Sequence, residues 1–358
     1  MQILLLKNWG YYLIFSLLFL SIICLSCSDD EPIEGLEEDE DQMEMEEPEV
    51  LFAEDFILDG GMKLVNYILP ASDYNKFLIR EAEYELVTNK VYEYFKDDFD
   101  FIFILTDEDE KPDDLYFGQA RRVQSDIIGI GAETFDRTRA HGSDGALKLA
   151  IHLPVPRFIR TGPFLHEIAH YWGNQGFIPT TVGGHWGYSS VGGQLGGFDE
   201  LIELGDNTYQ GRFNGRDGFG TFANGGNTLP YSNVELYIMG LIGIEELESI
   251  LVAENPESSG EGVFTADAVT TYTAEDMIDL HGQRSPLSDA SQKVFKGITI
   301  LLSTAPVSTD KIEAINSNLE NFSRDAAPDD NWGRANNFWM ATGGRATLDL
   351  EITDASFK

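Results

Sequence analysis

Cysteine is scarce in this sequence. The chain of 358 residues has two cysteines, Cys24 and Cys27, and both lie near its N-terminus. The long remainder therefore offers no disulfide, no thiolate nucleophile and no cysteine metal ligand. Chemistry in that remainder has to come from His, Asp, Glu, Ser or Tyr side chains, or from a metal that they bind.

Positive charge is also scarce. The sequence has 24 Lys and Arg residues against 61 Asp and Glu residues, which gives a formal net charge of -37. A surface this acidic repels nucleic acid and anionic lipid headgroups, so we expect no nucleic-acid partner. Two common catalytic motifs are missing as well, because the sequence has no GxSxG nucleophile elbow and no Walker-type phosphate loop.

An apolar run from Tyr11 to Leu25 follows Lys7 near the N-terminus. This run is shorter than the about 20 residues that a membrane-spanning helix needs, and it is typical of the core of a signal peptide. We therefore predict a signal peptide over residues 1–26.

The residues after this run resemble the lipobox of bacterial lipoproteins. Leu25-Ser26-Cys27 is followed by Ser28-Asp29-Asp30-Glu31, although Cys24 stands where leucine is usual. The resemblance implies lipidation of Cys27 and a surface-exposed lipoprotein anchored in the outer membrane; the alternative is a secreted protein. Residues 27–50 contain thirteen acidic residues and no basic one, which predicts an extended, disordered tether.

Residues 51–358 are enough for one large domain, and their patterns mix helices with strands. Helical patterns cover 72–95, 163–173, 234–242, 275–280 and 311–322. Strand patterns cover 100–105, 127–130, 147–153, 294–302 and 345–352. Residues 173–230 are rich in glycine and lack a regular pattern. We therefore predict an α+β domain with a mixed sheet and two lobes, about 51–175 and a glycine-rich 176–358, that share a cleft.

The motif His166-Glu167-Ile168-Ala169-His170 carries the strongest chemical signal. Two histidines four positions apart lie on one face of a helix, where both imidazoles reach the same ion. Glu167 is placed to orient and deprotonate a zinc-bound water. Pro163 fits the first turn of this helix and Gly173 its end. The motif predicts a zinc site with Glu167 as the catalytic base.

This HExxH motif resembles the signature of zincin metallopeptidases. The strand at 147–153 resembles the edge strand along which zincins align their substrate. Gly173 matches the glycine of the metzincin pattern HExxHxxGxxH, but Gly176 stands where that pattern has its third histidine. The segments 184–186 and 231–240 are similar to uncharacterised bacterial zincin-like proteins. The resemblance implies a zincin-like fold with the motif on an active-site helix, and hydrolysis of peptide bonds.

A catalytic zinc needs a third protein ligand. His185 is the first choice, because the glycines around it let the chain return to the helix. Glu235 is the alternative, and it would make the site resemble that of gluzincins, which use a glutamate from a later helix. With His185 as the ligand, Met239 would correspond to the metzincin Met-turn beneath the metal.

Three tyrosines are candidate donors of a phenol to the developing oxyanion, and the sequence selects none of them: Tyr188, Tyr231 and Tyr237. The loop 214–227 sets oxygen-bearing side chains among glycines, as calcium loops do, but it lacks the ligand order of an EF-hand. Zinc is therefore the expected cofactor, and calcium is the weaker alternative.

Together these patterns predict an anchored zinc metallopeptidase that acts on a protein or peptide substrate. Two alternatives stay open. One is a non-catalytic surface binding protein on a zincin scaffold. The other is a zinc hydrolase that acts on a different amide.

Overall fold

The computed structural model describes residues 52–358, and these residues belong to one compact unit. The predicted signal peptide, the acidic tether and Cys27 lie outside the described residues. Helices combine with a mixed sheet, which confirms the α+β prediction at the level of fold class. Between residues 52 and 358 there is no helix with the length and apolar character needed to cross a membrane.

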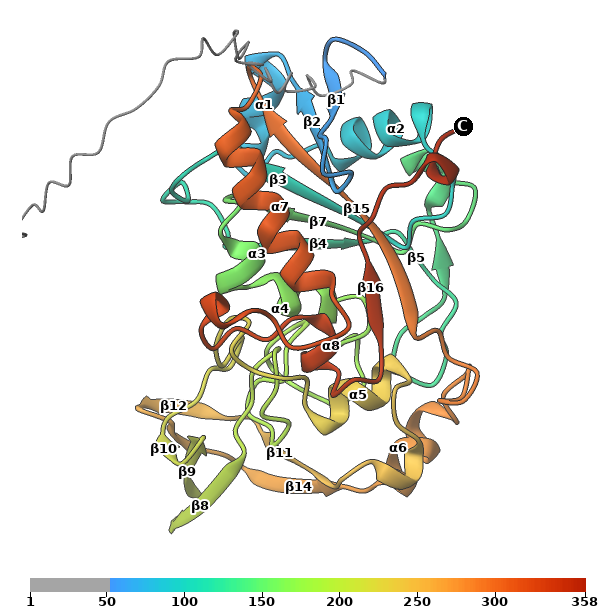
Figure 1. Ribbon diagram of the computed structural model, residues 1–358. Coiled ribbons are helices and arrows are strands. Elements are labelled where there is room, and N and C mark those ends of the chain that lie inside the picture. The colour runs from blue at the N-terminus through green and yellow to red at the C-terminus, as the bar shows by residue number, and fades with distance from the viewer. Residues whose placement is uncertain (1–51) are drawn as a thin grey trace, which may run out of the picture. The chain divides into compact units, whose positions relative to one another are not determined.

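A seven-stranded sheet forms the centre of the domain (Figure 1). Its strand order is β1-β2-β15-β3-β7-β4, and β16 pairs with β15. The strands are β1 (Phe56–Leu58), β2 (Leu64–Ile68), β3 (Phe101–Thr106), β4 (Gln119–Arg122), β7 (Leu149–Leu153), β15 (Val294–Ser303) and β16 (Thr347–Asp349). Strands β2, β15, β3 and β7 run parallel, whereas β1 and β4 are antiparallel to their neighbours. Because β15 lies between β2 and β3, both predicted lobes contribute to one sheet.

Alternation along β3 explains why helices pack on both faces of this sheet. Phe101 and Phe103 belong to one hydrophobic cluster, and Ile102 and Ile104 belong to another. Successive strand residues point to opposite faces, so a strand that is apolar throughout is buried on both sides. The second cluster contains residues of α1 (Ala71–Leu78) and α2 (Tyr84–Tyr94). The first contains residues of α4 (Phe164–Ala169), α5 (Asn233–Met239), α7 (Thr309–Ser323) and α8 (Phe338–Ala341).

A second antiparallel sheet has the order β10-β9-β13-β12, with β8 paired to β9 (Figure 1). Its strands are β8 (Glu200–Gly205), β9 (Thr208–Phe213), β10 (Arg216–Asp217), β12 (Glu257–Gly260) and β13 (Val263–Thr265). Two further pairs are β5 (Gln124–Ser125) with β6 (Phe135–Asp136), and β11 (Ile250–Glu254) with β14 (Ala268–Tyr272). The remaining helices are α3 (Phe158–Thr161) and α6 (Ala274–His281), with short 3-10 turns at Thr138–His141, Ile244–Glu246, Asp330–Trp332 and Asp354–Ser356.

Three secondary-structure predictions are wrong. The expected continuous helix over 72–95 is two helices, α1 and α2, and Arg80 between them has a left-handed φ of 64°, which a helix cannot contain. Residues 127–130 form no strand, since their only strand-like pairing is an isolated bridge between Ile128 and Ser285. The apolar pattern there reflects the burial of Ile127 and Ile130 in the core. The glycine-rich region 173–230 does contain regular structure, namely β8, β9 and β10.

The position of β7 also differs from the expectation. The strand exists at Leu149–Leu153, but it lies between β3 and β4 and is therefore internal. The edge of the sheet on this side is β4, whose residues Gln119–Arg122 are mostly polar. Polar side chains are typical of edge strands, because they discourage pairing with other chains. This edge lies next to the site described below.

Candidate metal centre

Helix α4 carries His166 and Glu167 of the HExxH motif, with His170 as its C-cap residue, and its own apolar side fixes it in place. Phe164, Leu165 and Ile168 are fully buried in the hydrophobic cluster that covers one face of the central sheet. The first backbone N–H groups of a helix need partners, and the N–H of Leu165 donates to Oδ1 of Asn227 at 3.1 Å. With the apolar side anchored, His166 is directed to the pocket beside β4.

Three histidines converge beside this helix. The side chains of His166, His170 and His185 each offer one ring nitrogen, and these nitrogens all lie within 4.8 Å of one another. Nε2 of His166 and Nε2 of His170 are 3.1 Å apart. Two nitrogen ligands of a tetrahedral zinc ion, each bound at about 2.0–2.1 Å, would be separated by about 3.3 Å. The spacing of the pair therefore suits one ion bound by both rings.

Backbone carbonyl groups hold two of the three rings. Nδ1 of His166 lies 2.7 Å from the carbonyl oxygen of Gln194, and Nδ1 of His185 lies 2.9 Å from that of Gly183. An Nδ1–H that donates to a carbonyl leaves Nε2 as the free lone pair, and such partners orient metal-binding histidines in general. Gly173 does not end this helix as expected, because α4 ends at Ala169 and His170 is its C-cap residue.

Burial keeps the three imidazoles neutral. It lowers the pKa of His166 to about 4, and it lowers the pKa of His185 as well. The pKa of His170 is lowered by burial and then by the other two rings. A neutral imidazole is the form that binds a metal ion, so the rings need not lose a proton at neutral pH before binding.

The carboxyl group of Glu167 lies in the same pocket and is surrounded by protein. Burial raises the pKa of Glu167 to about 8, while a backbone hydrogen bond with Ala120 acts in the opposite direction. A Cβ atom at Gly118 would come within 2.6 Å of Cγ and 2.7 Å of Oε1 of Glu167. Only glycine leaves room for the carboxyl at this point. Gly118, which directly precedes β4, therefore provides the space that the Glu167 carboxyl occupies.

Glu235, the alternative third ligand, has other partners. Oε1 accepts hydrogen bonds from Trp186 Nε1 and from the N–H of Leu195, each at 2.9 Å. Oε2 accepts from the N–H groups of Gln194 at 3.1 Å and Ser232 at 2.9 Å. The side chain is 1% exposed and is not part of the histidine group. It holds the segment that carries His185 at one end and the carbonyl partner of His166 at the other.

The three candidate tyrosines make contacts away from the histidines. The hydroxyl of Tyr231 donates to the carbonyl of Leu165 at 2.9 Å inside the core. Tyr188 packs against Phe264, with ring centroids 5.0 Å apart, and Tyr237 packs against Phe177. None of the three lines the pocket at the histidines. Met239 is 2% exposed in the main hydrophobic cluster, and its role as a Met-turn stays a prediction.

The loop considered for calcium uses its side chains to bind the backbone. Asn224 accepts from the N–H of Gly220 and donates to the carbonyl of Gly197. Asn227 donates to the carbonyl of Ile159 at 2.7 Å, in addition to its contact with α4. Within residues 52–358, the histidine group is the one cluster of three or more His, Cys, Asp or Glu side chains placed to share an ion.

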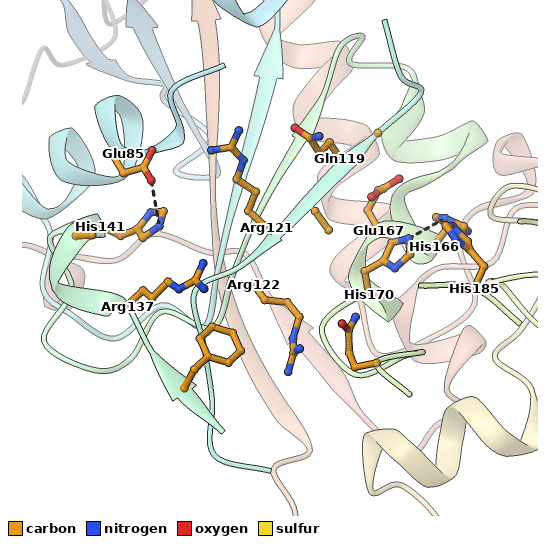
Figure 2. Close-up of a pocket in the computed structure, with 15 residues that line it drawn as sticks. Glu85, Gln119, Arg121, Arg122, Arg137, His141, His166, Glu167, His170 and His185 are labelled. Carbon is orange, nitrogen blue, oxygen red and sulfur yellow. Dashed lines mark hydrogen bonds and ion pairs between the residues drawn. The ribbon is translucent and has the colours of Figure 1, made fainter. Parts of the chain in front are cut away.

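Two pockets meet at His166 and Glu167. One has a volume of about 700 Å³ and extends from the three histidines along β4 to Arg137 and His141 (Figure 2). The other has a volume of about 550 Å³, and its wall contains three phenylalanines, Phe117, Phe158 and Phe222. Sequence reasoning missed both walls, because β4 and the phenylalanines are brought to α4 by contacts between distant segments. The polar sequence of β4 gives no alternating hydrophobic signal that could have identified it.

Comparison with known proteins adds no family to this picture. No family model, no curated protein and no solved structure matches the chain.

Proposed function

We propose that this protein is a zinc-dependent hydrolase of peptide bonds with a zincin-like site. One observation carries the proposal. Three neutral imidazoles, His166, His170 and His185, bring ring nitrogens within 4.8 Å of one another, and the buried carboxyl of Glu167 lies in the same pocket. Three histidines leave a fourth position open on a tetrahedral ion, which is the arrangement of a catalytic rather than a structural zinc.

The donor set fits zinc. Imidazole suits zinc, and the described residues place no cysteine and no carboxylate among the three ligand groups. When bound there, zinc would polarise a substrate carbonyl and lower the pKa of a water molecule toward neutrality. The spacing of the His166 and His170 nitrogens agrees with such an ion.

Glu167 is the residue that would move the proton. Its carboxylate would accept a proton from the attacking water and deliver it to the amine that leaves. A general base works best when its pKa is near the working pH, and burial shifts Glu167 in that direction. A neighbouring cation would lower this pKa again, so the carboxyl is ionised when it has to act.

The edge strand β4 supports a peptide as the substrate. Its outer side has no strand partner among the described residues, and Ala120 on this strand contacts Glu167. An extended peptide can add to an exposed sheet edge through main-chain hydrogen bonds. In this proposal β4 takes the part that the sequence assigned to the strand at 147–153.

Zinc content and chelator sensitivity test the proposal directly. We expect purified protein to contain about one zinc ion per chain, and to cleave an unfolded protein substrate. A chelator should stop cleavage, and added zinc should restore it. Protein that holds zinc but cleaves no peptide would favour the binding protein or a hydrolase of another amide, and protein without affinity for zinc would contradict the site.

Membrane anchoring through Cys27 is a separate proposal and rests on the sequence alone. In a bacterial host we expect the protein to partition with detergent and membranes, since a lipidated cysteine inserts its acyl chains. A Cys27→Ser variant should lose that partitioning. Equal partitioning of both proteins would show that Cys27 is not the anchor and would leave the secreted alternative.

A further inference from the structure

Three arginines line the larger pocket beside the histidines. Arg121 and Arg122 belong to β4, and Arg137 follows β6. Figure 2 shows them between the pair formed by Glu85 and His141 and the three histidines. In a chain with a net charge of -37, a pocket wall with three arginines is locally opposite in sign to the rest of the protein.

These arginines have no acidic partner within residues 52–358. Neither an ion pair nor a side-chain hydrogen bond to a described residue is formed by any of the three, whereas Arg212 pairs with both Glu200 and Asp217. Nε and Nη2 of Arg122 are buried without a hydrogen-bond partner. No described carboxylate neutralises the three guanidinium groups that line the pocket, so they are available to an anionic ligand that enters it.

Aromatic rings hold the guanidinium groups in place. Those of Arg122 and Arg137 lie 5.0 Å and 5.4 Å from the centroid of the Phe135 ring. The guanidinium of Arg121 lies 4.3 Å from the centroid of Tyr84. Stacking on a ring restricts an arginine without using its hydrogen-bond donors, which stay available for a planar anion such as a carboxylate.

We propose that the substrate is a peptide with acidic side chains on the N-terminal side of the cleaved bond, and that Arg121, Arg122 and Arg137 bind these side chains. This inference rests on the proposed peptidase function. A carboxylate accepts two parallel hydrogen bonds from one guanidinium, which makes arginine the side chain best suited to recognise Asp and Glu.

The direction of the peptide follows from β4. A peptide that pairs antiparallel with β4 runs from the Arg122 end of the strand toward the Gln119 end. Its earlier residues then pass the arginines, and its later residues pass Glu167. The residue after the cleaved bond reaches the second pocket, whose phenylalanines fit an apolar side chain. A sulfated or uronic-acid glycan could meet the arginines but could not pair with the strand edge.

Peptide binding to a Glu167→Gln variant tests the inference without hydrolysis. The probes are three fluorescent peptides of equal length with one fixed leucine as the residue after the cleaved bond. One has Asp and Glu before that bond, one has Asn and Gln there, and one has the acidic residues after the leucine. We expect the first to bind about 10-fold or more tightly than the other two, and added salt to reduce this preference.

Arginine variants in the Glu167→Gln background test whether these arginines cause the preference for the acidic peptide. Arg122→Gln combined with Arg137→Gln should abolish it, and the exposed Arg137→Gln alone should reduce it, which guards against misfolding of the double variant. Arg139→Gln is the matched control, because Arg139 is exposed close to Arg137 but does not line the pocket. It should leave the preference unchanged.

Several outcomes would overturn the inference. They are equal binding of the acidic and amide peptides, a preference that survives in the arginine variants, and tighter binding of the peptide with acids after the leucine. Displacement of the acidic peptide by a sulfated oligosaccharide that itself binds more tightly would assign the arginines to a glycan. If the acidic preference is present but the unmodified protein cleaves none of the peptides, acid recognition stands and the peptidase proposal fails.

Discussion

A Glu167→Gln variant should keep its metal and lose its hydrolytic activity. Glutamine is close in size to glutamate, so the crowded contact with Gly118 is preserved, but it cannot accept a proton from water. General acid–base catalysis contributes about 10²- to 10⁴-fold, and we expect kcat to fall by that factor. The measurement is kcat on a peptide that the unmodified protein cleaves, together with zinc content by elemental analysis.

The control for this variant is Glu248→Gln, at an exposed glutamate outside both pockets. It makes the same chemical change and should leave kcat unaltered. If Glu167→Gln cleaves as fast as the unmodified protein, Glu167 is not the base. If it loses zinc as well as activity, the carboxyl supports the metal site, and its role as a proton carrier would need to be abandoned.

A His185→Ala variant should bind zinc far more weakly than the unmodified protein. Loss of an outer hydrogen-bond partner of a ligand costs about 10- to 100-fold in metal affinity, and loss of a ligand itself should cost more. His185 lies on a loop and makes a T-shaped contact with the exposed ring of Phe222, so its removal should leave α4 and the core in place. Competition with a chelator of known affinity measures the change, and circular dichroism checks the fold.

The matched control is His281→Ala. His281 is hydrogen-bonded to the carbonyl of Phe177 and lies outside the histidine group. Its substitution should leave zinc affinity within the error of the measurement. Unchanged affinity in His185→Ala would leave two ligands from α4 and would reopen the question of the third, with Glu235 as the competitor.

The parts of the structure that could be predicted are those with a local signal. The apolar run at 100–105 is β3, and the runs at 147–153 and 294–302 are β7 and β15. The motif helix begins after Pro163 as expected, but it ends at Ala169, earlier than the predicted end at Gly173, and His170 is its C-cap residue. His185 could be chosen because glycines on both sides allow the chain to turn back toward α4, where the structure places it.

The parts that could not be predicted depend on contacts between distant segments. Four residues of β4, two of them arginine, give no periodic pattern, yet their pairing with β7 makes them the edge beside Glu167. A strand's neighbours are chosen by register and by the path of the chain, so the sequence of β7 cannot tell whether it is internal. The sequence likewise cannot show that the arginines of β4 lack acidic partners, because the residues that surround them come from distant parts of the chain.

Glu235 illustrates a different limit of prediction from sequence. Its sequence setting, a glutamate at the start of a helix after Ser232, is that of a capping box, and the structure contains that box. The same carboxylate also binds Trp186, Gln194 and Leu195, which lie 40 to 49 residues earlier in the chain. Local reasoning identifies a carboxylate near the site but cannot distinguish a ligand from a residue that holds the ligand loop.

The place of β15 in the sheet has a consequence for how the chain acquires its shape during synthesis. This strand pairs on one side with β2 and on the other with β3, although its Thr299 lies 235 positions after Leu64 of β2 and its Gly297 lies 196 positions after Phe101 of β3. The ribosome makes both partners long before it makes Val294–Ser303. A growing chain therefore has an open gap in the middle of its sheet until translation is nearly finished, and α4, although already made, has an incomplete platform to pack on.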